Sequence, residues 1–341
     1  MVISKREFLV RRMRNLGLMQ LLAWAARRPG LLALAYHRIG PCSSQPFDDG
    51  VFSATAESFR DQIRYLRDHF EILPIDELLD SMHRGLDLKK PTALITFDDG
   101  YRDNFETALP ILREFEVPAV FFIAPGYIDR PRLTWWDRIA YVVKNTKRDV
   151  LEIEYPTSAK FDLRENGRSR VAVQILSAYT QTPEIDQQCF FDLLEDAADV
   201  SVDSRELGDG LFMSWDQVRK LNAEGMEIGG HTYDHPVLSR VSEDDQLREL
   251  TLSKDRLESE VRANIRVMAY PVGGLDCFDD ATKRLVSDTG YEAAFSFYGG
   301  FNRPGHHDPL DIRRISVERQ DSLPMFRFRA SMCNLFDTTV F

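Results

Sequence analysis

The sequence feature that most constrains the fold is an alternation, from residue 30 onward, of short apolar runs with segments of helical periodicity. The clearest apolar runs lie at 31–36, 92–97 and 117–123. Between the first two, Phe59, Ile63 and Leu66 recur at the spacing of one helix face. Continuous apolar runs are typical of strands buried on both faces, and their alternation with helices is typical of βα units. Because one chain carries many such units, we expect an α/β fold that closes into a barrel rather than two separate domains.

A stretch from about residue 131 to 211 interrupts this pattern. It contains the pair Trp135-Trp136, a charged run and two helical patterns. Apolar runs then return near 226–228, 265–270, 291–297 and 312–317. We therefore expect a barrel over residues 29–320, with a helical insertion at about 131–211 between elements of its sheet. Residues 321–341 are expected to form a C-terminal extension.

Residues 1–28 differ from the rest of the chain in charge. The chain has a formal net charge of −11, from 54 acidic and 43 basic side chains, whereas this segment contains seven basic residues and one acidic residue. Its apolar residues roughly follow helical spacing, which predicts a basic amphipathic helix suited to an anionic membrane surface. Two other interpretations remain open, a solvated helix packed on the domain and a signal peptide with residues 16–26 as its apolar part. We expect a cytoplasmic protein, with this helix as its contact to the inner face of the membrane.

Composition excludes several other classes of protein. Of the residues, 43% are hydrophobic and 11% aromatic, enough for a sizeable core, so a globally disordered chain is excluded. No run of about 18 apolar residues occurs, so a membrane-spanning helix is not expected. The acidic net charge argues against a nucleic-acid partner, which requires a concentrated basic surface. The four cysteines have no CxxC spacing and predict neither a disulfide framework nor a thiolate zinc site.

Two adjacent carboxylates follow one of the predicted strands, in Thr96-Phe97-Asp98-Asp99-Gly100. Active sites of parallel α/β barrels lie at the carboxyl ends of the strands. Carboxylates buried there are costly unless they are paired, hydrogen-bonded or bound to a metal. The alternative is an ordinary polar turn. Phe47-Asp48-Asp49-Gly50 repeats the tetrapeptide without a preceding apolar run, so we interpret that copy as a loop and the later one as a candidate site.

Two histidines lie four residues apart, in His231-Thr232-Tyr233-Asp234-His235, directly after a predicted strand. At this spacing both imidazoles can face one metal ion, although such a pair taken alone is more often a coincidence. Their place at a strand end, like that of Asp99, favours a shared site. One carboxylate and two imidazoles leave coordination positions open for water and substrate, as in catalytic metal sites. The set suits zinc, and also cobalt, nickel or iron.

Three motifs in this order resemble those of the polysaccharide deacetylases with a NodB-type domain, carbohydrate esterase family four. They are Thr-Phe-Asp-Asp-Gly at 96–100, His-Thr-x-x-His-Pro at 231–236, and Arg-x4-Pro-x-Gly from Arg266 through Pro271 to Gly273. The resemblance covers roughly residues 30–320. It implies a distorted (β/α)7 barrel and metal-dependent hydrolysis of the N-acetyl group of an amino sugar.

The resemblance also implies a role for the matched residues. Asp99, His231 and His235 would bind a divalent metal, for which zinc is favoured. Asp98 would act as general base, and Arg266 would hold Asp98 in place electrostatically.

The general acid is implied less directly. Many members of the family carry a Leu-x-His strand near the C-terminus, and no such pattern follows residue 310. Instead Ala35-Tyr36-His37-Arg38 ends the first strand. It resembles a permuted subgroup, typified by the exopolysaccharide deacetylases, in which an N-terminal Tyr-His supplies the imidazole. His37 is therefore the expected acid, with a hydrogen-bonded core histidine as the alternative.

Sugar recognition leaves a weaker mark in the sequence, and the tryptophan-bearing fourth motif of the family is not evident. Aromatic side chains can stack on a pyranose face, although core packing is their more common role. Of the pair Trp135-Trp136 in the insertion, we expect Trp136 to meet the substrate. Pro271, and Tyr101 through a backbone N–H donated to the oxyanion, complete the expected substrate contacts. The adjoining Asp137-Arg138 is interpreted as a surface ion pair.

The expected function is deacetylation of an amino sugar in a surface polysaccharide or its lipid-linked precursor, and the expected partner is that glycan or glycolipid. One alternative keeps the enzyme and changes the acyl group, as in a deformylase acting on a lipid-linked amino sugar. Another is a carbohydrate-binding barrel without turnover, and the presence of every residue expected for base and ligands argues against it.

Overall fold

A ring of seven parallel strands forms the centre of the molecule. The computed structural model describes residues 28–41, 46–305 and 307–336. In order of neighbours the strands are β11 (Ala293–Phe295), β10 (Val267–Ala269), β9 (Glu227–Gly230), β6 (Val120–Ile123), β5 (Pro91–Phe97), β1 (Gly30–Tyr36) and β12 (Arg314–Ser316). Each neighbouring pair is parallel. The two predicted apolar runs that became β1 and β5 pair along their whole length, with nearly every side chain buried.

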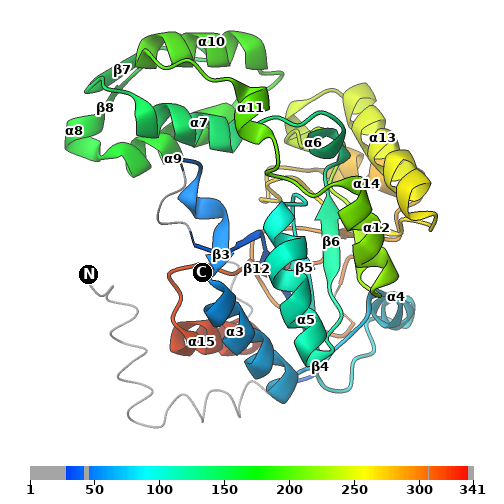
Figure 1. Cartoon of the computed structure of the whole chain (residues 1–341). Coiled ribbons are helices and arrows are strands. Elements are labelled where there is room, and N and C mark those ends of the chain that lie inside the picture. The colour runs from blue at the N-terminus through cyan, green and yellow to red at the C-terminus, as the bar shows by residue number, and fades with distance from the viewer. Residues whose placement is uncertain (1–27, 42–45, 306, 337–341) are drawn as a thin grey trace.

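The two edges of the sheet meet, so the ring is nearly closed. Ile312, just before β12, forms a parallel bridge with Phe295 of β11, and its N–H donates to the carbonyl of Ala294 at 2.9 Å. A short strand, β4 (Glu71–Ile72), pairs with β5 outside this ring. The predicted distorted (β/α)7 barrel is therefore confirmed (Figure 1).

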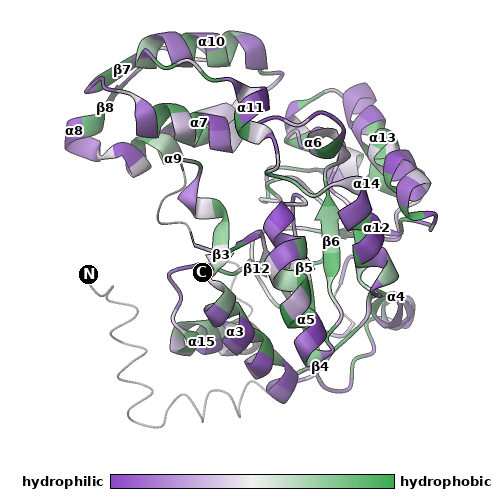
Figure 2. Cartoon of the chain, viewed as in Figure 1, coloured by the Kyte–Doolittle hydropathy of each residue, from purple (hydrophilic) through white to green (hydrophobic). Residues whose placement is uncertain are grey.

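Helices surround the ring and bury their apolar faces on it. They are α3 (Ala56–His69), α4 (Ile75–His83), α5 (Leu109–Phe115), α12 (Trp215–Ala223), α13 (Glu243–Val261), α14 (Asp280–Asp288) and α15 (Leu323–Phe336). In α3 the predicted face is buried, since Phe59, Ile63 and Leu66 are 0% exposed, and the Thr55 hydroxyl accepts the N–H of Ser58 at the helix start. Figure 2 shows the same division, with β6 green and α12 and α13 banded purple and green.

Short elements follow the carboxyl ends of the strands and border that end of the barrel. They are β2 (Arg38–Ile39) paired with β3 (Phe52–Ala54), a 3-10 turn at Asp49–Val51, a π-helical turn at Asn104–Ala108, α6 (Pro125–Asp129) and a 3-10 turn at Leu238–Arg240. The repeated tetrapeptide at 47–50 lies in this group and runs into the first 3-10 turn.

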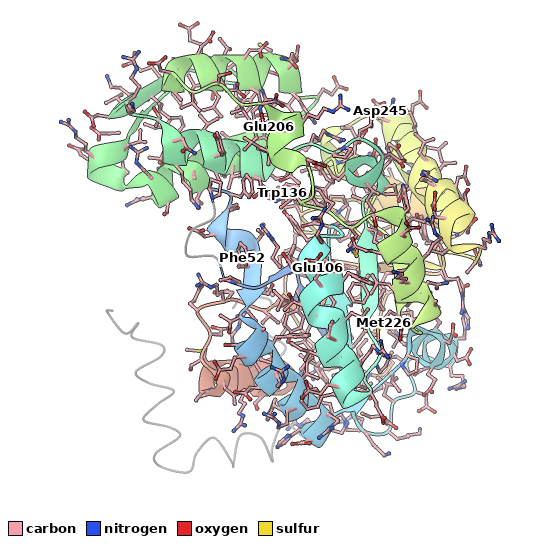
Figure 3. The ribbon with its side chains drawn as sticks, viewed as in Figure 1. Phe52, Glu106, Trp136, Glu206, Met226 and Asp245 are labelled. Carbon is pink, nitrogen blue, oxygen red and sulfur yellow. The ribbon has the colours of Figure 1, made fainter. Side chains whose placement is uncertain are left out.

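The insertion forms a lobe between β6 and β9. It consists of α7 (Trp135–Asn145), the antiparallel pair β7 (Val150–Ile153) and β8 (Ala159–Asp162), α8 (Leu163–Asn166), α9 (Arg168–Gln181), α10 (Gln187–Ala198) and α11 (Ser204–Gly208). The lobe has an apolar core of its own, with Ile139, Ile175 and Leu194 at most 1% exposed. Figure 1 shows it at the upper left, and Figure 3 shows Trp136 where the lobe meets the barrel.

The predicted amphipathic helix lies outside the described residues except for residue 28, so it stays a prediction. In the C-terminal extension, α15 packs against α3 and β1, and the ring of Phe326 lies 6.1 Å from that of Tyr65. Within the part of the chain that the structure describes, no helix combines the length and apolarity needed to cross a membrane.

Candidate active site

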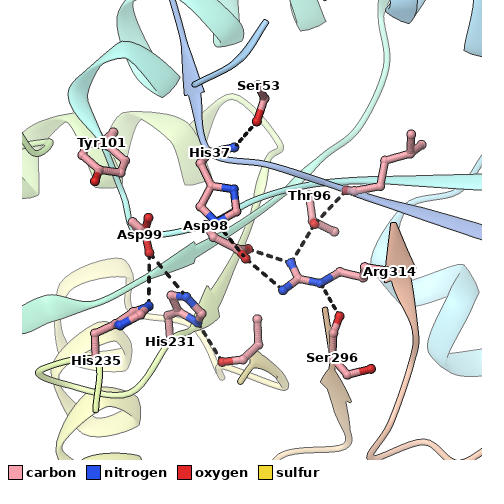
Figure 4. A network of polar contacts seen from close by, with 12 residues as sticks. His37, Ser53, Thr96, Asp98, Asp99, Tyr101, His231, His235, Ser296 and Arg314 are labelled. Atoms are coloured by element: carbon pink, nitrogen blue, oxygen red, sulfur yellow. Dashed lines mark hydrogen bonds and ion pairs between the residues drawn. The ribbon is translucent and has the colours of Figure 1, made fainter. Parts of the chain in front are cut away.

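The predicted functional side chains gather at the carboxyl ends of the central strands. Asp98 and Asp99 directly follow β5, His231 directly follows β9, and His37 directly follows β1 (Figure 4). Parallel strands of one ring end at the same rim, which is why segments so distant in sequence meet there. Both aspartates and His231 are at most 3% exposed, and His235 is 5% exposed. Ionisable groups so deeply buried require partners.

Asp99, His231 and His235 converge on one point. Oδ1 of Asp99 lies 3.5 Å from Nε2 of His231 and 3.4 Å from Nε2 of His235, and the three donor atoms lie within 4.8 Å of one another. Two donors that each bind a tetrahedral ion at about 2.0–2.1 Å are about 3.3 Å apart. The structure thus brings the three predicted ligands to a spacing that fits one divalent metal ion.

Hydrogen bonding and burial prepare the imidazoles for this role. Nδ1 of His231 lies 2.8 Å from the carbonyl oxygen of Ala269. A carbonyl only accepts, so Nδ1 carries a proton, and Nε2 is the nitrogen that faces Asp99 and can bind a metal. Burial, together with the neighbouring His231, lowers the pKa of His235 to about 3. His235 is therefore neutral, the form in which histidine binds metals.

Asp99 is ionised although it is buried. Burial raises its pKa, but the hydrogen bond with His231 and the nearby His37 outweigh burial, so the pKa lies below its usual value. The pKa of His231 lies above its usual value. Burial lowers this pKa, but the hydrogen bond with Asp99 and the charge of Asp98 raise it by more. Before a metal binds, the carboxylates thus attract positive charge to this point.

Asp98 is held by an arginine that the sequence analysis missed. Arg314, on β12, donates from its two terminal nitrogens to the two oxygens of Asp98 at 2.6 and 2.8 Å. It also donates to the Thr96 hydroxyl at 2.9 Å and to the carbonyl of Ser296 at 3.0 Å. Burial raises the pKa of Asp98, but the Arg314 charge dominates and lowers the pKa to about 2. The carboxylate is therefore ionised and fixed in orientation.

The predicted role of Arg266 was wrong. Arg266 precedes β10, and its guanidinium pairs with Glu292 at 2.6 Å and Asp76 at 2.5 Å. Pro271, which completes the same motif, follows the carboxyl end of that strand. The two motif residues lie five positions apart, and a strand rises about 3.3 Å per residue. They therefore lie at opposite ends of the barrel, and Arg266 cannot reach Asp98.

A signal for Arg314 was present in the sequence. The predicted strand at 312–317 reads Ile-Arg-Arg-Ile-Ser-Val, so an arginine had to lie on one of its faces. Arg314 is 0% exposed, and a fully buried guanidinium requires a carboxylate. Of the two neighbouring aspartates at this rim, Asp98 was the one that had not been assigned as a metal ligand.

His37 faces the same site from β1. Its Nε2 lies 3.9 Å from Oδ2 of Asp98, and its ring lies 5.5 Å from that of Phe297. Its backbone is fixed on both sides, since its N–H donates to the Ser53 hydroxyl at 2.9 Å and its carbonyl accepts from Asn104 at 2.5 Å. The side chain is 22% exposed. It is thus open to a substrate, unlike a core histidine.

Trp136 lies at the site, but in a different role from the predicted one. It is 5% exposed, and its ring lies 4.6 Å from the ring of His235. Its indole N–H donates to the Tyr101 hydroxyl at 2.8 Å. A buried indole has no open face for a sugar ring, so the expected stacking platform was wrong. Trp136 instead packs against a candidate metal ligand.

Tyr101 also contributes its side chain to the protein interior. Its ring is 0% exposed and stacks on Phe212 with 4.9 Å between centroids. Only its backbone can therefore meet a substrate. Among the described residues, none accepts a hydrogen bond from the Tyr101 N–H. Pro271 is buried beside a tight turn, in which the N–H of Gly273 donates to the Pro271 carbonyl at 2.6 Å.

The predicted surface ion pair Asp137-Arg138 was also wrong. Asp137 is 0% exposed and accepts hydrogen bonds from the N–H of Asp48 at 2.9 Å and from the Tyr101 hydroxyl at 3.2 Å. Arg138 pairs with Glu195 inside the lobe. Burial raises the pKa of Asp137 to about 6. The lobe is thus attached to the rim by a buried polar network, which single-sequence patterns do not reveal.

Comparison with known proteins adds family and fold. The model of the polysaccharide deacetylase family matches residues 85–294. Poly-beta-1,6-N-acetyl-D-glucosamine N-deacetylase of Escherichia coli is 26% identical over 103 residues, and the enzyme of that name from Staphylococcus aureus is 27% identical over 152 residues. These matches cover 30% and 41% of this chain. The chain spans 15% of the length of the first relative and 52% of the second.

Solved structures share the fold at low identity. A Streptococcus pyogenes deacetylase, PplD, in complex with acetate aligns with a TM-score of 0.59 at 18% identity, over 89% of this chain and 99% of that one. IcaB from Ammonifex degensii aligns with a TM-score of 0.58 at 21% identity, over 89% and 98%. Both alignments extend beyond the family-model match at 85–294, which excludes His37 and Arg314.

Proposed function

Because the chain belongs to the polysaccharide deacetylase family, we propose that it is a metal-dependent enzyme that hydrolyses the N-acetyl group of an amino sugar. The proposed substrate is a polysaccharide or its lipid-linked precursor. The observation that carries the proposal is the meeting, at one rim, of Asp99, His231 and His235 with an ionised Asp98 that takes no part in that ligand set. A carbohydrate-binding barrel without turnover would have no use for this second, arginine-held carboxylate.

The ligand set fits a divalent cation, and zinc suits two imidazoles and one carboxylate best. Cobalt, nickel and iron share these ligand preferences. When bound, the cation supplies Lewis acidity, which polarises an amide carbonyl and lowers the pKa of water. The protonated Nδ1 of His231, held by the Ala269 carbonyl, orients that imidazole before any metal arrives.

Asp98 is the proposed general base. A base must lie within reach of the proton that it accepts, and the place of Asp98 at the end of β5, in the same cluster as ligand Asp99, supports this role. Arg314 keeps Asp98 ionised and aimed at the site. Division of labour between the two neighbouring carboxylates follows from their partners, an arginine for one and imidazoles for the other.

His37 is the proposed general acid. An amine leaves an amide only when its nitrogen is protonated, and imidazole is suited to deliver a proton near neutral pH. His37 lies across the site from the ligand histidines, 3.9 Å from Asp98. The proposed base and acid thus lie side by side at the rim, and the backbone N–H of Tyr101 is the proposed donor to the oxyanion.

The proposed substrate class rests on the named relatives, which are N-deacetylases of a β-1,6-linked N-acetylglucosamine polymer. We further propose that residues 29–320 form the catalytic unit and that residues 321–341 extend it. The basic segment 1–28 would place the enzyme at the inner face of the membrane, near lipid-linked glycans.

Acetate release from β-1,6-linked N-acetylglucosamine oligomers tests the proposal. We expect the full chain to release acetate. Acetate release should stop after treatment with a chelator and resume when zinc is added. Metal analysis of Asp99→Ala and His235→Ala should show loss of bound metal. Stoichiometric metal in both variants would remove the proposed ligand set. Formate release from N-formyl substrates without acetate release from N-acetyl ones would change the acyl group.

A further inference from the structure

The loop that carries the two candidate metal ligands has an unusual backbone. Thr232 has φ of 56° and His235 has φ of 59°, both in the left-handed region. A β-branched residue such as threonine is a true outlier there, and a residue held in this conformation is strained. The loop keeps this shape only if its surroundings compensate for the strain.

A buried carboxylate on a neighbouring helix supplies part of that compensation. Oε2 of Glu249, on α13, accepts the backbone N–H of Tyr233 at 2.9 Å and that of Asp234 at 2.7 Å. These two residues lie between the ligands in sequence. Glu249 is 5% exposed, and burial raises the pKa of its carboxyl.

The fold of the helix does not require a carboxylate at this position. The other buried residues of α13 are uncharged, namely Gln246, Leu250, Ser253, Leu257 and Val261. Burial of a carboxylate is unfavourable unless hydrogen bonds offset the loss of hydration. At Glu249 the two N–H groups of the loop provide these hydrogen bonds, so we assign Glu249 a role in holding the loop.

The opposite side of the loop is held by a backbone hydrogen bond and by ion pairs that are partly exposed. The N–H of Gly126 donates to the Tyr233 carbonyl at 2.8 Å, and a Cβ on Gly126 would lie 2.6 Å from that oxygen. Arg130 and Arg132 pair with Asp234 at 2.7 and 2.6 Å. The Arg130 side chain is 60% exposed and that of Asp234 35%, and exposed ion pairs contribute little. Glu249, in contrast, is a buried charged group in contact with the loop.

We propose that Glu249 is a positioning residue that holds the loop from His231 to His235 in its metal-binding shape and thereby sets the affinity of the site for a divalent cation. The inference rests on the proposed function, since it requires that the site binds metal. When the loop already has its metal-binding shape, less free energy is lost in ordering it as the metal binds. Groups that orient metal ligands are typically worth about 10–100-fold in metal affinity.

Two substitutions separate the hydrogen bonds from packing and charge. Glu249→Gln keeps a carbonyl oxygen for both N–H groups, whereas Glu249→Leu fills similar volume on the buried face and removes the acceptor. Zinc affinity of the full chain is measured by competition with a chromophoric chelator. We expect Glu249→Leu to weaken zinc binding about 10–100-fold and Glu249→Gln to weaken it by about threefold or less.

Control variants set the scale. Asp255→Ala lies on the exposed face of the same helix and should leave zinc affinity unchanged. Arg130→Ala removes one exposed ion pair to the loop and should change it by about twofold or less. Wild-type zinc affinity in Glu249→Leu would overturn the inference, as would an equal loss in Glu249→Gln, which would assign the effect to charge rather than to the hydrogen bonds.

A failure of the proposed function would give a different result, because the wild type itself would then bind no zinc. A further measurement requires no variant and decides the matter if Glu249→Leu does not fold. In the metal-free wild type, peptides that contain Tyr233 and Asp234 should show slow amide hydrogen exchange, because Glu249 holds both N–H groups before metal binds. Exchange at the rate of an unstructured peptide would overturn the inference.

Discussion

Arginine–carboxylate pairs lie at both ends of the barrel, and they differ in burial and in chemical use. At the carboxyl ends of the strands, Arg314 and Asp98 have side chains that are 0% and 4% exposed. At the amino ends, Arg266 and Glu292 have side chains that are 26% and 33% exposed. The residue types and distances are nearly the same. Strong coupling is expected only for the buried pair, because water and salt screen the other.

The comparison shows why a motif match misassigned the arginine. A guanidinium near a carboxylate is common on protein surfaces and has little effect there. At the catalytic rim the same pair fixes one protonation state and one orientation of Asp98. Location along the strand, rather than the presence of the pair, decides which arginine serves the site.

Loss of the base should produce the largest effect. Asp98→Asn keeps the shape of the side chain but removes the proton acceptor, so we expect kcat to fall about 10²–10⁴-fold with metal content unchanged. Acetate release under saturating substrate, with metal analysis of the same samples, measures both. Glu292→Gln, at the amino end, is the matched control and should retain wild-type kcat. Turnover at the wild-type rate in Asp98→Asn would remove Asp98 from the mechanism.

Removal of Arg314 should destabilise the protein more than removal of Arg266. Arg314→Met leaves Asp98 buried without a partner, and we expect the free energy of unfolding to fall by about 3–5 kcal/mol. Arg266→Met removes a partly exposed pair and should cost about 1 kcal/mol or less. Urea unfolding of both variants measures the difference. Arg314→Lys, which keeps the charge and loses the two-point geometry, should fall between them, and equal losses at the two ends would contradict the comparison.

A smaller effect should distinguish the two ends by pH. Asp98 has a lowered pKa of about 2, so the stability it contributes is present above its ordinary pKa of about 3.9 and is lost as pH falls toward 2. Glu227, which begins β9 at the amino end, has a pKa raised to about 7 by burial and by Asp76. Its contribution is present below its ordinary pKa of about 4.3 and is lost as pH rises through 7.

Glu227→Gln tests the second half of this contrast. The variant cannot ionise, so it should be more stable than the wild type at pH 8 by about 1 kcal/mol, a value reduced for partial exposure, and closer to the wild type at pH 4. Unfolding free energies at the two pH values provide the measurement. A variant that gains stability equally at both pH values would show that Glu227 does not titrate between them.

Much of the fold was predictable because local patterns carry it. Apolar runs such as 31–36 and 92–97 became paired buried strands, and the break in periodicity after residue 131 marked the lobe. Asp99, His231 and His235 were also predictable, since each follows a strand and all are residue types that bind metals. The order of strands around the ring, by contrast, has no local pattern, because it results from which faces pack together.

The side chains that surround the ligands were harder to predict for the same reason. Trp136 and Asp137 read as a stacking platform and a surface ion pair in the sequence, yet both are buried where the lobe meets the rim. Glu249 resembles any other acidic residue of a charged helix, and only its contact with the loop gives it a role. Burial of a polar residue is a property of its neighbours, which lie far away in the chain.

The amino-acid sequence by itself determined the βα alternation, the strand ends that bear carboxylates and imidazoles, and the chemistry that those groups can perform. Only the tertiary structure decided that Arg314 rather than Arg266 holds Asp98, and that the lobe packs against His235 through Trp136. The physical reason is range. Backbone periodicity and side-chain chemistry act over a few residues, whereas ion pairing and burial depend on which distant segments the closed ring brings together.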